Sequence, residues 1–124
     1  MSDNFDLVVV EGVGGVLVPY DNKNLVIDIA RGLKLPVLLV VQNKLGAINH
    51  TLLTLEALRK RKFKLLGVIF NNLKKEDPRI LKDNVEIIKR FCREKILGVL
   101  ERQDNINKLQ REFEPIGKKI KILL

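Results

Sequence analysis

The feature that most constrains the fold is the alternation of short, uninterrupted aliphatic runs with longer amphipathic stretches. The aliphatic runs cover residues 7–10, 37–41, 65–70 and 96–100. Runs that are apolar at nearly every position are typical of strands buried on both faces, and the stretches between them carry apolar residues at helical spacing. The pattern predicts an α/β protein with three layers, in which a mostly parallel sheet has helices on both faces.

Four stretches between and after these runs are expected to be helices. Before the stretch at 24–33, Asp21 or Asn22 is available as a cap. At the start of the stretch at 77–93, Asp77-Pro78 suits a helix start, because proline is favoured at the first helical position. After the stretch at 104–113, Pro115 and Gly117 interrupt the helical pattern, so that the tail is expected to be irregular. The expected helices cover residues 24–33, 48–62, 77–93 and 104–113.

The first aliphatic run, residues 7–10, has no sequence before it that could supply a neighbouring strand. A strand of this kind normally lies inside a doubly wound sheet, and an exposed aliphatic edge invites pairing with other chains. We therefore expect this edge to be covered by another chain or by the C-terminal tail.

Composition narrows the class of protein. The 124 residues are 46% hydrophobic and 31% charged, which fits a single globular domain covering residues 1–124. The apolar runs are too short to span a bilayer, and the N-terminus does not resemble a secretory signal. We expect a cytoplasmic location and no membrane partner.

The net charge of +8 could indicate nucleic-acid binding. The basic residues, however, gather near the ends of expected elements, in residues 59–62, 74–75 and 118–119, rather than along one stripe. The first group closes an expected helix, where cations stabilise the negative end of the helix dipole. Aromatic residues that could stack on bases are scarce. We therefore expect no nucleic-acid partner and favour a protein that handles anionic ligands.

In an open α/β sheet, ligands gather at the carboxyl ends of the strands. The first run ends in Glu11-Gly12-Val13-Gly14-Gly15. A carboxylate in this place can hold a magnesium ion, while the glycines let the backbone approach a phosphate. The alternative is a plain turn in which the glycines supply positive φ angles. The pattern alone does not separate the two.

The second run leads through residues 44–49 into a helix. Backbone N–H groups at a helix start attract a carboxylate or phosphate, and the side chains of Lys44 and Asn49 add donors. The alternative for Asn49 or Thr51 is simple N-capping. His50, the only histidine, is expected to have a structural role rather than to transfer protons.

The third and fourth runs end in polar residues that should lie at the same edge. Asn71 and Asn72 follow the third run, and an amide can donate and accept together and so pair with the edge of a base. A plain Asx turn is the alternative. Glu101-Arg102-Gln103 follows the fourth run and is a weaker indication.

Taken in order, these segments resemble the C-terminal half of the dethiobiotin synthetase family, which belongs to the P-loop NTPase-like α/β proteins. The resemblance covers the chain from about residue 6 to residue 100. Its most specific part is Ile-Asn-His-Thr-Leu-Leu-Thr. The segments that carry it are Glu11-Gly12-Val13-Gly14-Gly15 with Pro19, Leu35-Pro36-Val37, Lys44 to Thr54, Gly67 to Asn71, and Leu97-Gly98.

The resemblance implies an ATP- and magnesium-dependent carboxylation and ring closure of 7,8-diaminopelargonic acid. ATP would phosphorylate a carbamate formed from CO2, and the second amine would then close the ureido ring, releasing ADP and phosphate. Family members are homodimers with the carboxylate pocket at the subunit interface. The implied site residues are Glu11 for magnesium, Gly14 near the phosphates or substrate, Lys44, Gly46, Ala47, Ile48 and Asn49 around the substrate carboxylate, Asn71 at adenine, and Glu101 and Arg102 near the nucleoside.

The sequence also departs from the family pattern. It contains no Gly-x-x-x-x-Gly-Lys-(Ser/Thr), no counterpart of the aspartate that shares the magnesium, and no lysine for the carbamate. Glu101 stands where a proline is usual. Without the phosphate loop, phosphoryl transfer loses its main electrostatic stabilisation. We therefore expect the chain to be inactive alone and to need a separate subunit that carries a P-loop. A non-catalytic binding or regulatory module and a truncated reading frame are the alternatives.

Overall fold

The computed structural model describes residues 5–73 and 75–124. Helices and strands alternate along most of this chain. The strands form one parallel sheet in the order β1-β2-β3. The elements are α1 (Val26–Leu33), β1 (Val37–Gln42), α2 (Ala47–Lys60), β2 (Leu65–Asn71), α3 (Pro78–Phe91), β3 (Ile96–Leu100) and α4 (Ile106–Leu123).

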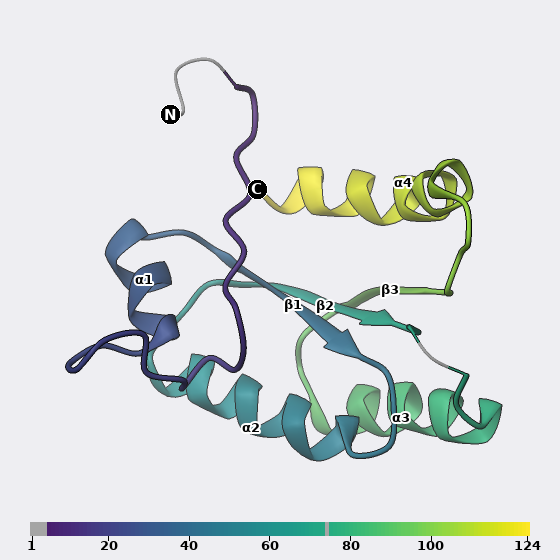
Figure 1. Ribbon diagram of the computed structural model, residues 1–124, viewed down its shortest axis with the longest axis horizontal. Coiled ribbons are helices and arrows are strands. Elements are labelled where there is room, and N and C mark those ends of the chain that lie inside the picture. Colours follow the sequence, from purple (N-terminus) through teal and green to yellow (C-terminus); the bar gives the residue numbers. More distant parts are fainter. Residues whose placement is uncertain (1–4, 74) are drawn as a thin grey trace.

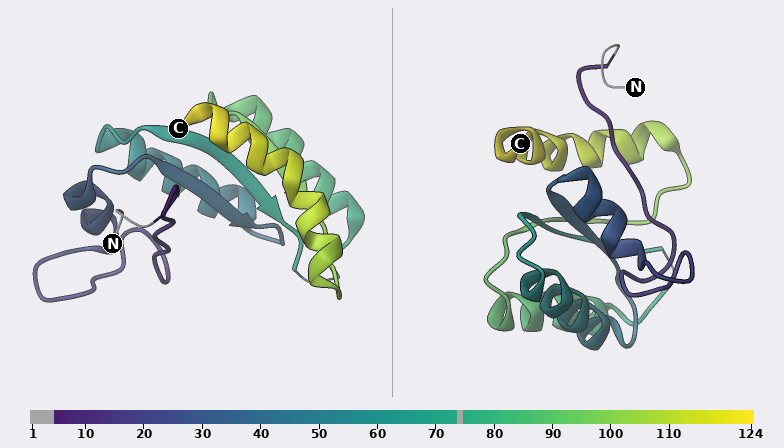
Figure 2. Two further views of the ribbon diagram at one scale, coloured as in Figure 1. Left: turned by 90° about the horizontal axis from the view of Figure 1, so that it is seen from above. Right: turned by 90° about the vertical axis from the view of Figure 1, so that its left-hand side faces the viewer.

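The sheet lies between two helical layers, with α2 and α3 on one face and α4 on the other (Figures 1 and 2). The central strand β2 pairs with β1 on one side and with β3 on the other. Its residues 66–70 are all buried, which explains why this strand is apolar at every position between its ends. The predicted α/β class and three-layer arrangement are confirmed.

The core has two parts, because successive strand residues point to opposite faces of the sheet. Val68 and Phe70 of β2 face α2 and α3, whereas Ile69 faces α4. The buried residues under α2 and α3 are Val41, Ala47, Leu55, Val68, Phe70, Val85 and Ile88, and those under α4 are Ile69, Leu97, Leu100 and Ile116.

The prediction of a first strand at residues 7–10 is wrong. The segment has no strand assignment, and its side chains are exposed, with Leu7 at 60% and Val9 at 82%. Aliphatic composition favours a strand only when a neighbouring strand supplies hydrogen bonds and a packed face. No strand of the described residues lies beside this segment. Cover by the C-terminal tail is wrong too, because α4 packs on β3 and leaves these side chains exposed. Cover by another chain stays a prediction.

Two helix starts differ from prediction by two residues, and α4 begins at Ile106 rather than at residue 104, with Asn105 as its N-cap. The first helix begins at Val26, not at residue 24, because Asp21 stabilises the turn before it instead of capping it. The Asp21 carboxylate accepts hydrogen bonds from the N–H groups of Lys23 and Asn24, both at 2.7 Å. The predicted start of α3 is confirmed: Asp77 is its N-cap and accepts from the Arg79 N–H at 2.8 Å.

The prediction of an irregular tail is also wrong, because α4 continues through Pro115 to Leu123. Proline in a helix interior costs about 3 kcal/mol. Against this, Ile116 is buried and Leu109, Ile120 and Leu123 pack beside it at helical spacing. Burial of aliphatic side chains contributes roughly 1.5–3 kcal/mol each when complete. The packing of this face on the sheet therefore outweighs the proline.

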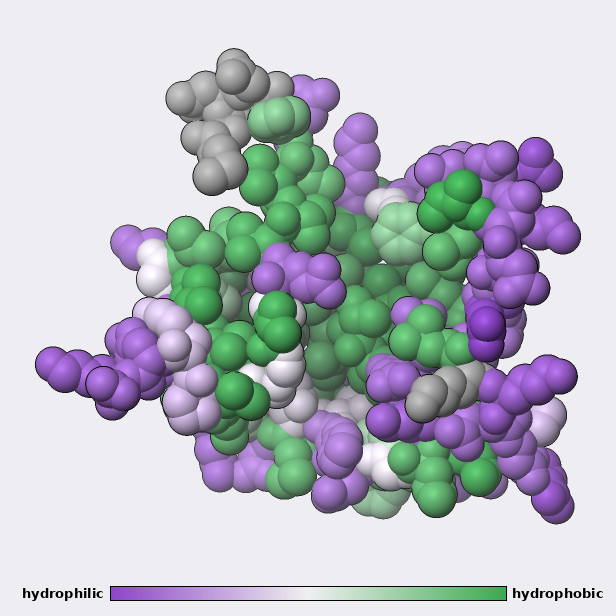
Figure 3. Space-filling model, in the orientation of Figure 1, coloured by the Kyte–Doolittle hydropathy of each residue, from purple (hydrophilic) through white to green (hydrophobic). Residues whose placement is uncertain are grey.

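Apolar side chains remain exposed along the N-terminal segment. Phe5 is 67% exposed and Val13 is 87% exposed. Figure 3 shows apolar side chains of this segment running into a hollowed apolar area at the centre of one face of the molecule. Within residues 5–73 and 75–124, none of the helices has both the length and the apolar content needed to cross a bilayer.

Candidate functional site

The carboxyl ends of the three strands meet at one edge of the sheet. Gln42 of β1 lies opposite Asn71 of β2, which lies opposite Leu100 of β3. Backbone hydrogen bonds continue past the strands, because the Asn43 N–H donates to the Asn71 carbonyl at 2.9 Å and the Asn72 N–H to the Leu100 carbonyl at 2.8 Å. The polar groups that follow each strand are therefore held on one rigid edge.

Two buried amides fix the loop between β1 and α2. Asn43 and Asn84 are 1% and 4% exposed. The Asn84 Nδ2 donates to the Asn43 Oδ1 at 2.8 Å and to the Lys44 carbonyl at 2.9 Å, and the Asn43 Nδ2 donates to the Leu81 carbonyl at 3.1 Å. These bonds fasten the loop to α3. The sequence analysis assigned no role to either amide, although an asparagine directly after a buried strand was a usable signal.

The start of α2 is not capped by a side chain. Gly46 occupies the N-cap with a φ of 87°, in the left-handed region that glycine tolerates best. The alternative that Asn49 or Thr51 caps this helix is therefore wrong. Thr51 lies one turn inside the helix instead.

The first turn of α2 retains free donors. The Ala47 N–H donates to the Lys44 carbonyl at 3.0 Å. The N–H groups of Ile48 and Asn49 have no acceptor among the described residues. Unpaired N–H groups and the positive end of the helix dipole together attract an anion. Of the backbone groups that the resemblance implies at this helix start, the Ala47 N–H is paired within the chain, and binding of a carboxylate here stays a prediction.

A cavity of about 270 Å³ lies beside β1 at this helix start. It brings together two predicted features that are far apart in the sequence, the glycine turn after residue 11 and the start of α2. Gly14 has a φ of 77°, so the turn also uses its glycine for backbone conformation. The lining residues are Gly14, Gly15, Val16, Leu39, Val40, Val41, Gln42, Lys44, Ala47, His50, Thr51 and Thr54.

The Thr51 side chain is the most informative group in this cavity. It is 2% exposed, and its hydroxyl has no hydrogen-bond partner among the described residues. A buried hydroxyl without a partner costs about 1–3 kcal/mol. The sequence analysis considered this threonine only as a cap and missed its position on the cavity wall, because that position depends on how α2 packs against β1.

The predicted magnesium ligand is placed apart. Glu11 is exposed and does not line the cavity. The described residues contain no group of three His, Cys, Asp or Glu side chains arranged to hold a metal ion. Magnesium is usually bound by one or two carboxylates together with substrate phosphates and water. The described residues offer one carboxylate here, and Glu11 as a magnesium ligand stays a prediction.

The predicted nucleoside residues gather at the ends of β2 and β3. Asn71 is half-buried, and beside it the Asn72 Nδ2 donates to the Glu101 Oε1 at 2.8 Å. Arg102 is exposed, with its Nε 4.0 Å from the Asp104 carboxylate. This group shares the sheet edge with the cavity but does not line it. Asn72, which was predicted together with Asn71 as an amide that could pair with a base edge, is buried at 3% exposure.

Comparison with known proteins identifies the family. The family model described as an AAA domain matches residues 1–110. An ATP-dependent dethiobiotin synthetase from Akkermansia muciniphila is 47% identical over 100 residues, which are 81% of this chain and 47% of that protein. The chain belongs to the dethiobiotin synthetase family. The resemblance indicated by the sequence motifs is confirmed.

Other dethiobiotin synthetase relatives agree. The ATP-dependent enzyme from Endomicrobium trichonymphae is 41% identical over 99 residues, 80% of this chain and 44% of that protein. A biotin biosynthesis bifunctional protein from Bordetella avium is 53% identical over 72 residues, 58% of this chain and 16% of that protein. The chain thus spans less than half the length of the dethiobiotin synthetases that it matches.

Proposed function

We propose that this chain forms the substrate-carboxylate half of a dethiobiotin synthetase, which carboxylates 7,8-diaminopelargonic acid and closes its ureido ring with ATP. The cavity beside β1 carries this proposal. Lys44 and Thr51 are among its lining residues near the start of α2, the Ile48 and Asn49 amides are free at that helix start, and no Asp or Glu lines it. Lone donors in a partly buried site suit a carboxylate.

The walls of the cavity suit the rest of this substrate. Val16, Leu39, Val40 and Val41 form an apolar surface next to the donors. An aliphatic acid can place its carboxylate at the helix start and its carbon chain along β1. Fixing both ends would orient the amines for reaction and remove much of the entropy of bringing the reacting groups together.

The groups that handle phosphate are proposed to come from elsewhere. The sequence has no P-loop motif, and Glu11 is the one carboxylate assigned to magnesium. We infer that a separate subunit with a P-loop holds most of the ATP and the metal ion, and that this chain alone does not turn over substrate. The Asn71, Glu101 and Arg102 group is proposed to contact the nucleoside from this side.

A second candidate is a non-catalytic binding or regulatory module. It is favoured by one observation, namely that the chain has a cavity at its predicted carboxylate site but no P-loop motif in its sequence. The proposed homodimer and the proposed cytoplasmic location remain predictions, and light scattering and cell fractionation test them.

Calorimetric titration of the chain with diaminopelargonic acid tests the site. We expect binding that Lys44→Gln weakens about tenfold, as loss of one charge-assisted contact would. Lys82→Gln, on the exposed surface of α3, is the matched control and should leave the affinity unchanged. Equal effects of the two variants, or no binding, would refute the site.

An activity assay separates the two candidates. Ring closure should be absent with the chain alone and appear when a P-loop-bearing half is added. Turnover by the chain alone would contradict the proposal that a separate subunit supplies the phosphate-handling groups. Substrate binding without any gain of activity on adding the partner favours the binding module.

A further inference from the structure

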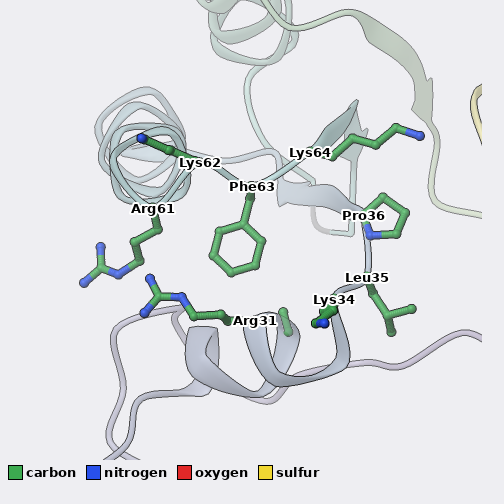
Figure 4. Close-up of a pocket in the computed structure, with 9 residues that line it drawn as sticks. Arg31, Lys34, Leu35, Pro36, Arg61, Lys62, Phe63 and Lys64 are labelled. Carbon is green, nitrogen blue, oxygen red and sulfur yellow. The ribbon is translucent and has the colours of Figure 1, made fainter.

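A second pocket lies at the opposite edge of the sheet. It occupies about 240 Å³ beside the residues that lead into β1 and β2 (Figure 4). Arg31 and Lys34 line it from the end of α1, and Arg61, Lys62 and Lys64 from the segment between α2 and β2, although the Lys62 and Lys64 side chains point away from the two arginines. Pro36 lines this pocket and Leu39 lines the candidate site, so at about 3.3 Å per residue the nearest parts of the two lie roughly 10 Å apart along β1.

The pocket is strongly positive. Its lining contains these five cations and no carboxylate. Two helix C-termini meet here, each carrying roughly half a negative charge, and these explain part of the accumulation. Asp28, 3.6 Å from Arg31, offsets one more charge. The positive charges of the lining residues exceed these negative contributions. Cations held together in this way repel one another unless an anion joins them.

The two arginines carry the geometric argument. Figure 4 shows Arg31 and Arg61 extending to the same side of the Phe63 ring, one from α1 and one from the end of α2. Arg61 donates from Nη1 to the Ala57 carbonyl at 3.1 Å. A guanidinium has five N–H donors, so most of those on both arginines stay available. Lys64 donates to the Leu123 carbonyl and points away, so it adds only longer-range attraction.

The backbone conformation of two lysines that line the pocket is a further observation. Lys34 and Lys62 have φ angles of 53° and 58°, and they are the non-glycine residues with positive φ in the described part of the chain. Both lie at helix C-termini, where glycine usually takes this conformation. A non-glycine residue there costs on the order of 1 kcal/mol. The chain thus bears strain at two positions that line one pocket, and both are cations.

We propose that this pocket binds a compact, multiply charged oxyanion of the pyrophosphate class, either free or as the phosphate chain of a nucleotide. Paired guanidinium groups match phosphate oxygens with two parallel hydrogen bonds each. The volume lies just under the roughly 300–1,000 Å³ of pockets for drug-sized ligands, which favours a small anion. This proposal is independent of the proposed function, because none of its residues lines the candidate site.

Calorimetric titration with inorganic pyrophosphate tests the pocket, in about 150 mM salt so that long-range attraction is screened. The double variant Arg31→Gln/Arg61→Gln should weaken binding about tenfold or more. Arg90→Gln/Arg93→Gln removes the same charge from exposed positions outside the pocket and should change affinity less than about twofold. Circular dichroism confirms that both variants fold.

A parallel titration with ADP distinguishes the two sources of the anion. Equal affinities for ADP and pyrophosphate identify the phosphate chain as the recognised group, and tighter pyrophosphate binding identifies the free anion. Absence of pyrophosphate binding, or equal weakening by the two double variants, overturns the proposal. Displacement of pyrophosphate by a tighter-binding RNA oligonucleotide also overturns it, because the patch would then be a nucleic-acid surface.

Discussion

At the scale of single residues, the candidate site depends on polar groups that lack a partner within the chain. The Thr51 hydroxyl is buried and unpaired on the cavity wall, and the Ile48 and Asn49 amides are free at the helix start. Asn43 and Asn84, by contrast, bond to each other and to backbone. The paired amides hold the loop, whereas the free Ile48 and Asn49 amides are the groups proposed to bind a ligand.

The substitution Thr51→Val tests this reading of the hydroxyl. Valine keeps the shape and removes the buried oxygen, so the free energy of unfolding should rise by about 1 kcal/mol. Urea denaturation of the ligand-free chain measures it. Thr54→Val, on the same cavity but half-buried, is the control and should change stability little. A loss of stability in Thr51→Val would show that the hydroxyl is hydrogen-bonded in solution.

A second residue-scale prediction concerns Glu94, which pairs with Arg59. The Arg59 Nε donates to the Glu94 Oε1 at 2.7 Å, and this hydrogen bond holds the pKa of the Glu94 carboxyl below its usual range. A carboxyl with a lowered pKa in the folded state stabilises the fold above its unfolded pKa. That contribution is lost as the pH falls through the folded pKa.

Glu94→Gln should therefore lower the free energy of unfolding at pH 7. The difference from wild type should shrink as the pH falls below the unfolded pKa of the Glu94 carboxyl and vanish once the pH is below its lowered pKa in the folded state. The effect at pH 7 should be modest, about 0.5–1 kcal/mol, because the Arg59 side chain is 41% exposed and water screens the pair. Denaturation at a series of pH values measures it. Glu86→Gln, whose lysine partner is fully on the surface, should show a smaller effect, and a difference that persists in acid would contradict the assignment.

At the scale of elements, the strands whose apolar pattern agrees with their burial in the sheet were predicted from the sequence. The strands at 37–41, 65–70 and 96–100 were predicted within one residue at each end, because the apolar runs are short and bounded by polar residues or turns. The prediction of a strand at 7–10 is wrong because a strand forms only beside a partner strand, and an apolar run by itself does not show whether such a partner is present. The prediction of an irregular tail after Phe113 is wrong because packing of α4 on the sheet outweighs the helix-breaking effect of Pro115.

The contact between α4 and β3 gives the prediction at this scale. A Cβ placed on Gly98 would lie 2.5 Å from the Cδ1 of Ile116, so Gly98→Ala should push α4 from the sheet. Overpacking of this kind costs about 1–3 kcal/mol. The same substitution at Gly32, in α1, meets no atom within 4 Å and should stabilise by about 0.5–1 kcal/mol. Thermal unfolding of the two variants should shift in opposite directions, and equal shifts would contradict the packing.

At the scale of the whole molecule, the cavity lies toward the carboxyl ends of the strands and the basic pocket at their amino ends. The strand ends that build the cavity were foreseeable, because parallel strands place their carboxyl ends together. The basic pocket was not, because residues 31–34 and 61–64 are far apart in the sequence and meet only once α1 and the end of α2 pack side by side. Basic residues that looked scattered along the chain are thus partly gathered in space; Lys74 lies outside the described residues.

The exposed apolar side of the molecule gives the last prediction. The outer edge of β1 has no strand beside it in the described chain, Val40 on that strand is 55% exposed, and the nearby Leu7 to Val10 segment is exposed as well. An aliphatic edge of this kind pairs with other chains. The purified chain should therefore self-associate, and sedimentation velocity over a concentration series should show it. Val40→Lys places a charge on the edge and should reduce the association, whereas Leu53→Lys, equally exposed at 56% but on α2, should not. If the chain is monomeric at every concentration, or if both lysines act alike, then the edge of β1 is not an association surface, and a partner subunit must be sought on another face.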